Sequence, residues 1–255
     1  MKISFVVITL NEEDNLARCL KSCADLAAEI VILDSGSTDR TEEIAREFGA
    51  RFEHQDWLGY VGQKNQAVSM AKNDWIFSLD ADEALSDGLR NEIQEIIYDG
   101  APQNINGFSM PRCVQYEERW IRNGDWYPDR VIRLFKKSVS KFAGGKVHER
   151  LEVEGGVEEF THDIHHYSFK DREDHWTRCE KYARLWAESE HERGKKVGVI
   201  SPYTHAIFRW FRGYILKMGF LDGWQGMRIA YYCAHEVKLK YQLLRQMNRR
   251  QREER

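Results

Sequence analysis

The chain has 255 residues, of which 42% are hydrophobic and 31% are charged, and its formal net charge at pH 7 is −3. This length can bury a full core, as one large domain or as one domain with an appendage. The nearly balanced charge gives no reason to expect nucleic acid as a partner, because nucleic-acid-binding domains are usually basic. The five cysteines are odd in number and scattered, which favours a reducing compartment over a disulfide framework.

Strand and helix patterns alternate in the first part of the chain. Apolar runs of strand length occur at residues 3–10, 29–33, 50–54 and 75–79. Helices are predicted between them, at residues 11–24, 41–49 and 59–70. Asn11 is a good N-cap for the first helix, and Asp39 or Thr41 can start the second. This alternation is typical of βαβ units and predicts a mostly parallel sheet.

The fourth apolar run ends in three carboxylates, Asp80, Asp82 and Glu83. A run that is apolar throughout is typical of a buried parallel strand, and the carboxyl ends of such strands open into the ligand crevice. Two aspartates one residue apart can share a divalent ion, for which Mg²⁺ and Mn²⁺ are suited. The alternative is that Asp82 or Glu83 only caps the next helix.

Carboxylates or carboxamides also end the first and second runs, at Asn11, Glu12 and Asp34. In a doubly wound sheet these strand ends converge on one edge, so the three together suggest a site for a metal and a nucleotide. The glycine-rich dinucleotide fingerprint and the P-loop are both absent from the sequence, which argues against NAD binding and ATP hydrolysis.

Four motifs in this order and spacing resemble the family 2 glycosyltransferases of the GT-A fold, a Rossmann-like, mostly parallel α/β sheet. The motifs are residues 6–12 (VVITLNE), 33–39 (LDSGSTD), 64–65 (KN) and 79–83 (LDADE). Four later motifs extend the resemblance to the bacterial β-1,4-glucosyltransferases of the lipopolysaccharide inner core, at residues 126–129 (WYPD), 133–135 (RLF), 147–149 (VHE) and 214–223 (YILKMGFLDG).

The resemblance implies a UDP-sugar pocket at the ends of the first two strands. It gives Asp34 a contact with uracil or ribose, and a carboxylate can accept hydrogen bonds from either. Thr9, Asn11 and Glu12 would line the nucleotide pocket. The family commonly has a second acid where this chain has Ser35, so the number of contacts made there stays open.

The same resemblance implies a metal and diphosphate site around the LDADE motif. Asp82 would hold Mg²⁺ or Mn²⁺, and Asp80 would do so directly or through water and ribose, with Ala81 between them in the nucleotide-sugar site. Lys64 would place a cation near the diphosphate, although a solvated helix lysine is an equal alternative.

Two further strands are predicted at residues 107–116 and 130–137, joined by an aromatic and charged segment. Among the later histidines, His166 is the best placed to join the metal or diphosphate, as the resemblance implies. Two carboxylates compete for the role of catalytic base. Glu149, which follows a glycine turn, is favoured by its place along the chain, and Asp129, at the start of a strand, is the alternative.

Beyond residue 171 the chain becomes helical. Residues 203–220 mix aromatic and basic side chains without an acid, which is typical of a helix at a membrane interface; packing against the catalytic domain is the alternative. The basic segment 238–255 is predicted to fray. We therefore expect a GT-A catalytic domain over residues 1–170 and a helical region over residues 171–255 that can associate with anionic membranes.

The predicted function is inverting transfer of a hexose, with glucose from UDP-glucose favoured, to a sugar hydroxyl of a lipid-linked core oligosaccharide. Another UDP-sugar or another acceptor is the nearest alternative. A nucleotidyltransferase would need a basic loop after the first strand, and a membrane-surface adaptor would leave the acidic strand ends unexplained. No signal peptide or spanning apolar run is present, which predicts a cytoplasmic protein, peripheral on the cytosolic face of the inner membrane.

Overall fold

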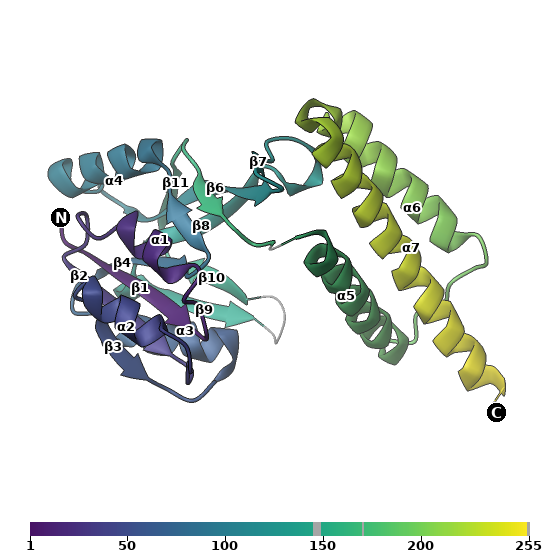
Figure 1. Cartoon of the computed structure of the whole chain (residues 1–255), viewed down its shortest axis with the longest axis horizontal. Coiled ribbons are helices and arrows are strands. Elements are labelled where there is room, and N and C mark those ends of the chain that lie inside the picture. The colour runs from purple at the N-terminus through teal and green to yellow at the C-terminus, as the bar shows by residue number, and fades with distance from the viewer. Residues whose placement is uncertain (145–148, 170, 254–255) are drawn as a thin grey trace. The chain divides into compact units, whose positions relative to one another are not determined.

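The structure is a computed structural model that describes residues 1–144, 149–169 and 171–253 (Figure 1). It divides into two compact units. Unit 1 contains Met1–Arg112 and Asp129–His166, and unit 2 contains Cys113–Pro128 and Tyr167–Arg255. Unit 2 therefore takes in a segment that the sequence analysis placed in the catalytic domain, in addition to the C-terminal helices.

Unit 1 is an α/β unit built on a mixed sheet. Its helices are α1 (Leu16–Lys21), α2 (Thr41–Glu47), α3 (Gly59–Met70) and α4 (Asp87–Asp99). Its strands are β1 (Ile3–Thr9), β2 (Glu29–Asp34), β3 (Arg51–His54), β4 (Trp75–Asp80), β5 (Glu83–Leu85), β6 (Ile105–Tyr116), β8 (Asp129–Lys136), β9 (Ser140–Gly144), β10 (Glu149–Val153), β11 (Gly156–Glu159) and β12 (Ile164–His166). The last residues of β6 belong to unit 2.

The main sheet has the strand order β3-β2-β1-β4-β8-β6-β12-β5. The neighbours β3, β2, β1 and β4 are all parallel, as the sequence predicts, whereas β8 runs antiparallel to both β4 and β6. The strands β9 and β10 form a separate antiparallel pair. Because β8 is antiparallel to β4, its first residue lies at the same edge of the sheet as the last residue of β4.

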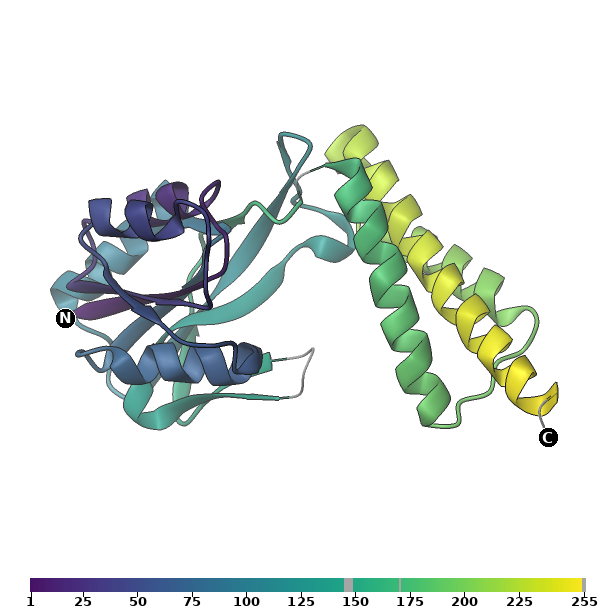
Figure 2. The ribbon, with the colours of Figure 1, turned by 60° about the horizontal axis from the view of Figure 1, so that its bottom comes forward.

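The parallel strands are buried on both faces, which explains their continuous apolar sequence. In β1, Phe5 and Val7 pack with α1, α2 and α4, whereas Val6 packs on the opposite face with α3. Figure 2 shows helices on both sides of the sheet. The core therefore forms a three-layer arrangement in which the carboxyl ends of β1, β2 and β4 lie at one edge.

One predicted helix start is wrong, and so is one of the alternatives. Asn11 is not an N-cap, because its φ is 55° and α1 begins only at Leu16, after Asn15. Asp82 and Glu83 do not cap the following helix either. Glu83 begins β5, and α4 is capped by Ser86, whose hydroxyl accepts a hydrogen bond from the backbone N–H of Leu89 at 3.3 Å. These side chains are therefore available for other contacts at the sheet edge.

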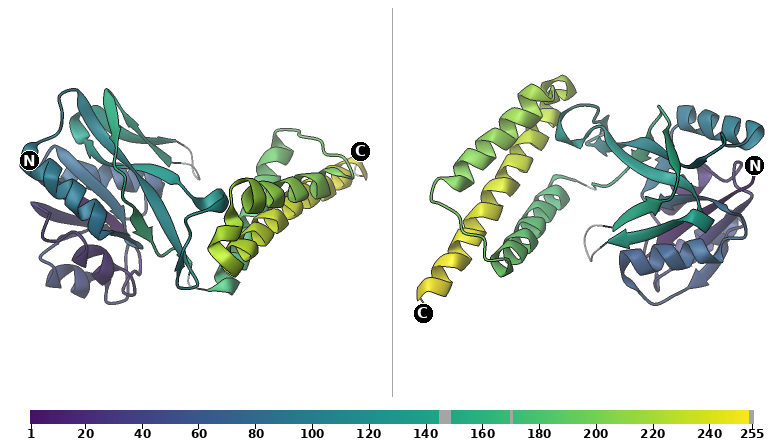
Figure 3. Two further views of the ribbon diagram at one scale, coloured as in Figure 1. Left: turned by 90° about the horizontal axis from the view of Figure 1, so that it is seen from above. Right: turned by 180° about the vertical axis from the view of Figure 1, so that it is seen from behind.

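Unit 2 is mainly helical, and Figure 3 shows its helices packed side by side. Its elements are β7 (Arg119–Trp120), η1 (Gly124–Trp126), α5 (Arg172–Glu192), α6 (Ser201–Phe211), the π-helix η3 (Arg212–Leu216), η4 (Gly219–Asp222) and α7 (Gly223–Glu253). Both α5 and α6 pack against α7. Within the described residues, no helix combines the length and the apolar character needed to cross a bilayer.

Two predictions for the C-terminal region are wrong. The segment 203–220 is not one helix, because α6 gives way to the π-helix and Met218 adopts a left-handed φ of 57°. The predicted fraying of residues 238–255 is not seen over residues 238–253, since α7 continues to Glu253, and residues 254–255 lie outside the described chain. The side chains of α7 find partners within unit 2: Tyr241 stacks on His205 with ring centroids 4.2 Å apart.

Candidate active site

The loop after β2 is organised by the Asp34 carboxylate. Oδ1 accepts hydrogen bonds from Thr9 Oγ1 at 2.8 Å and from Ser37 Oγ at 2.5 Å, while Oδ2 accepts from the N–H groups of Gly36 and Ser37, both at 2.7 Å. Burial raises the pKa of Asp34, but these hydrogen bonds outweigh it and hold the pKa below its usual value. Asp34 is only 3% exposed, so a uracil or ribose would share oxygens that already accept four bonds.

The residues after β1 are joined to this same loop. The N–H of Asn11 donates to Ser37 Oγ at 2.7 Å, and the Asn11 carboxamide oxygen accepts from the N–H of Thr38 at 2.9 Å. The N–H of Glu12 donates to Thr41 Oγ1 at 2.9 Å. Ser35 receives a hydrogen bond from Gln63 of α3 at 3.1 Å. The predicted nucleotide-pocket residues therefore do lie together, at the ends of β1 and β2.

Asp80, at the end of β4, lies between two cations. Its Oδ1 is 2.9 Å from Lys64 Nζ, and its Oδ2 is 2.5 Å from Arg133 Nη2. Burial raises the pKa of Asp80, but the charges of Arg133 and Lys64 outweigh it and lower the pKa well below its usual range. Both oxygens of Asp80 thus have a cationic partner, and its predicted role as a direct metal ligand would require one of these pairs to open.

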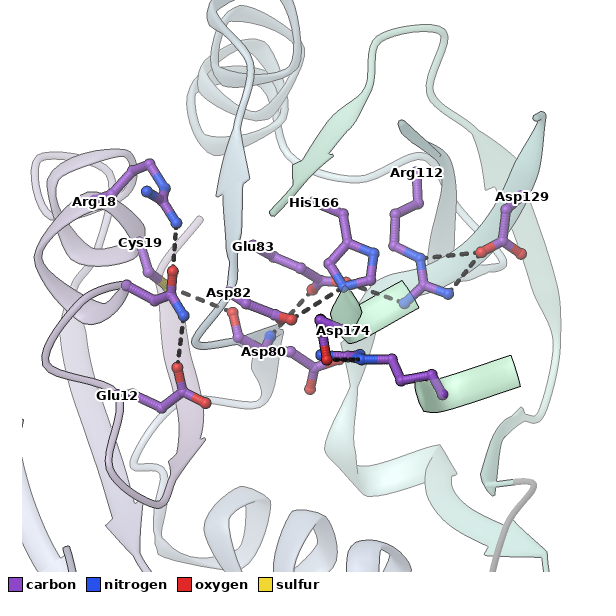
Figure 4. A network of polar contacts seen from close by, with 12 residues as sticks. Glu12, Arg18, Cys19, Asp80, Asp82, Glu83, Arg112, Asp129, His166 and Asp174 are labelled. Carbon is purple, nitrogen blue, oxygen red and sulfur yellow. Dashed lines mark hydrogen bonds and ion pairs between the residues drawn. The ribbon is translucent and has the colours of Figure 1, made fainter. Parts of the chain in front are cut away.

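Glu83 is fully buried and connects Asp80 to the next strands. Its Oε1 lies 2.6 Å from Arg133 and 3.3 Å from Arg112, and its Oε2 accepts the N–H of Asp80 at 3.1 Å. Arg112 in turn holds the second candidate base, Asp129, at 3.0 and 2.6 Å (Figure 4). The ion pairs are therefore continuous from the end of β4 to the start of β8.

Asp82 and His166 face each other across the turn after β4. The antiparallel pairing of β12 with β5 places His166 opposite Glu83, and His166 Nε2 then lies 3.2 Å from Asp82 Oδ2 (Figure 4). The side chain of His166 is 15% exposed and that of Asp82 is 29% exposed, so both remain accessible from solvent. His162 lies apart, paired with Glu92 of α4 at 3.3 Å.

This carboxylate and imidazole pair fits a divalent cation by the chemistry of its donors. No group of three or more His, Cys, Asp or Glu side chains in the described residues has the geometry of a metal site. Asp82 and His166 alone would leave most positions around a cation to water and substrate oxygens. That coordination is usual for Mg²⁺ bound with a phosphate-bearing substrate.

A cavity of about 340 Å³ opens beside this network. Its lining includes Lys64, Asp80 and Glu149, and Lys64 Nζ lies 3.1 Å from Glu149 Oε1. Asp129 is not among the lining residues. The cavity thus contains the favoured candidate base, a cation able to meet a diphosphate, and one of the strand-end aspartates.

Sequence reasoning noted Glu83 and Arg133 within motifs but assigned no role in the site to these two residues or to Arg112. Arg133 lies within the apolar pattern of β8, next to Leu134, and is only 5% exposed. A single arginine inside a strand that is otherwise buried requires an acidic partner, because an unpaired buried charge is strongly unfavourable. That signal could have pointed to the site, but the partner could not have been identified before the sheet order was known.

Comparison with known proteins identifies the family. The family model "Glycosyl transferase family 2" matches residues 4–148. The chain belongs to glycosyl transferase family 2. The predicted family, the α/β fold with its mostly parallel sheet and C-terminal helices, and the glycosyltransferase activity are therefore confirmed. The nucleotidyltransferase and the membrane-surface adaptor are no longer supported as the class of this protein.

Named relatives of this family 2 glycosyltransferase align over nearly its whole length. An uncharacterized glycosyltransferase of Rickettsia bellii is 31% identical, covering 97% of this chain and 87% of the relative. The lipopolysaccharide core biosynthesis glycosyltransferase LpsC of Rhizobium meliloti is 28% identical, and the alignment covers 95% of this chain and 94% of LpsC. Among solved structures, glucosyl-3-phosphoglycerate synthase of Mycobacterium tuberculosis is 23% identical, covers 45% of this chain and 44% of its own, and has a TM-score of 0.36.

Proposed function

We propose that this glycosyltransferase transfers glucose from UDP-glucose, with inversion, to a sugar hydroxyl of a lipid-linked lipopolysaccharide core oligosaccharide. The observation that carries the proposal is the cavity in which Lys64, Asp80 and Glu149 meet at the carboxyl end of β4. It combines a cation for the diphosphate with a carboxylate for the acceptor. The donor's uridine would lie at the ends of β1 and β2, near Thr9, Asn11, Glu12, Asp34 and Ser35.

In this proposal Asp82 and His166 would hold Mg²⁺ or Mn²⁺, with Asp80 next to them. The bound ion would offset the negative charge on the departing diphosphate. Lys64, which is paired with Asp80, would add a second positive charge. Because Lys64 is only 3% exposed, its ammonium group is held in place before the donor arrives.

Glu149 is the proposed base. The acceptor hydroxyl oxygen forms a bond to the anomeric carbon as the bond from that carbon to the diphosphate oxygen breaks. The hydroxyl proton passes to Glu149, and UDP leaves with the bonding electron pair. Glu149 lines the cavity that would receive the acceptor, whereas Asp129 does not line it and is held by two nitrogens of Arg112.

The acceptor and the location are proposed from the named relative. LpsC is described as a lipopolysaccharide core biosynthesis glycosyltransferase, and it aligns over nearly the whole chain. A core oligosaccharide carried on a lipid would place the enzyme peripherally, on the cytosolic face of the inner membrane. Another UDP-hexose or another acceptor is the nearest alternative, because a few pocket contacts decide such a choice.

The test is release of UDP from a panel of nucleotide sugars, with and without Mn²⁺ or Mg²⁺, followed by transfer to purified core oligosaccharide. We expect metal-dependent UDP release that is fastest with UDP-glucose and that increases when the core acceptor is added. Faster turnover of another nucleotide sugar would reject glucose as the donor. UDP release that does not respond to core oligosaccharide would reject the acceptor.

A further inference from the structure

Three cations surround one buried carboxylate in unit 2. Asp125 has a side chain that is only 4% exposed. Its Oδ1 lies 2.9 Å from Arg212 Nη2 and 3.3 Å from Lys217 Nζ, while its Oδ2 lies 3.1 Å from Arg209 Nη1. One negative charge is thus matched by three positive charges, which leaves a local surplus of about two positive charges at neutral pH.

Asp222, the first acid after Lys217 in the sequence, does not neutralise this surplus. Asp222 is 3% exposed and accepts hydrogen bonds from the N–H groups of Arg122 and Asn123, at 3.1 and 2.8 Å. The sequence from residue 203 to residue 221 contains no aspartate or glutamate. The surplus charge is therefore available to an anion from outside the chain.

The cations retain donors for such an anion. A guanidinium group carries five N–H donors in a fixed plane, of which Asp125 can use only some. The Arg209 side chain is 29% exposed, so part of its guanidinium group reaches solvent. The side chains of Arg212 and Lys217 are 37% and 48% exposed, so they reach solvent while Asp125 holds them together.

The backbone that carries these cations is tightly fixed. Arg212 begins a π-helix, and Met218 follows in the left-handed region with a φ of 57°. Both conformations are uncommon and tend to occur at functional sites. A Cβ atom added to Gly219 would lie 2.6 Å from the carbonyl oxygen of Gly213, so close backbone packing holds this turn.

Large apolar side chains are exposed along the same segment. From α6 to the start of α7, the large apolar side chains that are at least 43% exposed include Ile207, Phe208, Leu216, Phe220, Leu221 and Trp224. An exposed apolar surface next to basic side chains is typical of a protein segment that lies in the interface of a bilayer. A small soluble phosphate would account for the cations but not for these side chains.

We propose that Arg209, Arg212 and Lys217 bind the phosphoryl headgroup of an anionic membrane lipid, while the adjacent apolar side chains enter the bilayer. A phosphomonoester carries about 1.5 to 2 negative charges at pH 7, which matches the surplus. The inference deepens the proposed function, since it names the surface through which an enzyme with a lipid-linked acceptor meets the membrane.

Vesicle binding tests this site. The full-length protein is sedimented with vesicles of phosphatidylcholine alone, and with vesicles that contain phosphatidic acid or phosphatidylglycerol at equal total charge. We expect binding to the anionic vesicles, strongest with phosphatidic acid because it is a phosphomonoester. The variants Lys217→Gln and Arg212→Gln should each weaken it about tenfold or more, as expected for a lost charge-assisted hydrogen bond.

The matched controls are Arg46→Gln and Arg193→Gln, which remove the same charge from side chains that are 67% and 74% exposed. If the controls lose as much vesicle affinity as the site variants, binding depends on the protein's net charge alone, and the proposed site is overturned. Thermal unfolding checks that each variant is folded. Lys217→Gln is the safer variant, because Arg209 and Arg212 still hold Asp125.

Two further measurements are needed. One distinguishes a lipid headgroup from free inorganic phosphate, and the other distinguishes a failure of this inference from a failure of the proposed function. Ile207→Ser with Leu216→Ser should weaken vesicle binding without changing the binding of inorganic phosphate in calorimetry. Binding of inorganic phosphate without any binding to vesicles would overturn the lipid as the occupant. Hydrolysis of the donor is measured in parallel, without acceptor. If the donor is hydrolysed but the protein does not bind vesicles, only this inference fails. If the protein binds vesicles but does not hydrolyse the donor, the proposed function fails.

Discussion

Arg133 donates a hydrogen bond from Nη2 to Oδ2 of Asp80, with the two atoms 2.5 Å apart. The same nitrogen lies 2.6 Å from Oε1 of Glu83. Burial lowers the pKa of Arg133, but these two carboxylates outweigh it and raise the pKa above its usual value. Arg133 therefore remains charged inside unit 1, and it fixes the position of Asp80 at the edge of the sheet.

The first prediction is that Arg133→Met destabilises the protein. The substitution removes one of the two positive charges beside the buried carboxylate of Glu83. Breaking a buried ion pair in this way typically lowers the free energy of unfolding by about 3–5 kcal/mol. The control is Arg46→Met, which removes an exposed pair with Glu42 and should change stability by no more than ~0.5 kcal/mol. Urea unfolding measures both variants, and equal effects would contradict a structural role for Arg133.

The second prediction concerns the proposed metal pair. Asp82→Asn and His166→Gln should each weaken Mn²⁺ binding by tenfold or more, since even the loss of an outer-shell partner typically costs about 10–100-fold. Electron paramagnetic resonance of free Mn²⁺ measures this without any need for turnover. The control is His162→Gln, because His162 pairs with Glu92 instead, and unchanged affinity in the first two variants would remove them from the metal site.

The third prediction distinguishes the two candidate bases. Glu149→Gln keeps the shape of the side chain but removes its basicity, so turnover should fall by a factor of about 10²–10⁴ while UDP-glucose affinity changes little. Asp129→Asn should have a smaller effect on turnover, because Asp129 does not line the cavity. Single-turnover kinetics and calorimetry give the two readouts. The opposite pattern would move the role to Asp129.

The fourth prediction is a loss of stability in acid that depends on His175. Burial lowers the pKa of His175 to about 4, and its Nδ1 lies 3.0 Å from the hydroxyl of Tyr116. The unfolded chain, with a histidine pKa near 6.5, binds a proton first as the pH falls, so protonation favours unfolding. Stability should decrease from about pH 6.5 downward, by on the order of 3 kcal/mol in total below pH 4.

The control for this effect is His175→Phe, which removes the titrating group and keeps an aromatic ring in place. Urea unfolding at several pH values between 7 and 4 should show a smaller slope for the variant than for the unaltered protein. If both slopes are the same, other groups cause the acid sensitivity.

The fifth prediction is that the thiols react slowly in the folded protein. All five cysteines are free and buried. Burial raises the pKa of Cys23 and of Cys179 to about 12, so the reactive thiolate is scarce at neutral pH. A thiol reagent such as dithionitrobenzoate should label all five cysteines in denaturant and label them far more slowly without it. Rapid labelling of the native protein would contradict the described burial.

The strand-end residues could be predicted because they follow from local pattern. The apolar runs that form β1, β2 and β4 have the length and composition of buried parallel strands. That assignment places Asp34 and Asp80 at the carboxyl edge of the sheet. His166 was identified through the family resemblance, and the pairing of β12 with β5 places it beside Asp82. For the strand ends, a short stretch of sequence carries enough information, whereas the position of His166 depends on the pairing of distant strands.

The remaining features depend on contacts between distant parts of the chain. The left-handed Asn11 is bonded to Thr38 of another loop, so no local signal could predict that the first helix starts later. From its sequence context Glu83 resembles a helix-capping acid, and its partners Arg112 on β6 and Arg133 on β8 are known only from the folded structure. Likewise, the helical tail is stabilised by contacts such as that of Tyr241 with His205, which lie outside any local window.

The pairing of β12 with β5 also sets an order of events during synthesis. His166 lies 84 residues after Asp82. At a translation rate of about 5–20 residues per second, roughly 4–17 seconds separate the emergence of these two side chains from the ribosome. The strands that carry the acidic edge can assemble in that interval, but β5 has no β12 to pair with. The residues of the proposed nucleotide pocket therefore leave the ribosome before the proposed metal pair is complete, because residue 166 must emerge before both ligands can face the same ion.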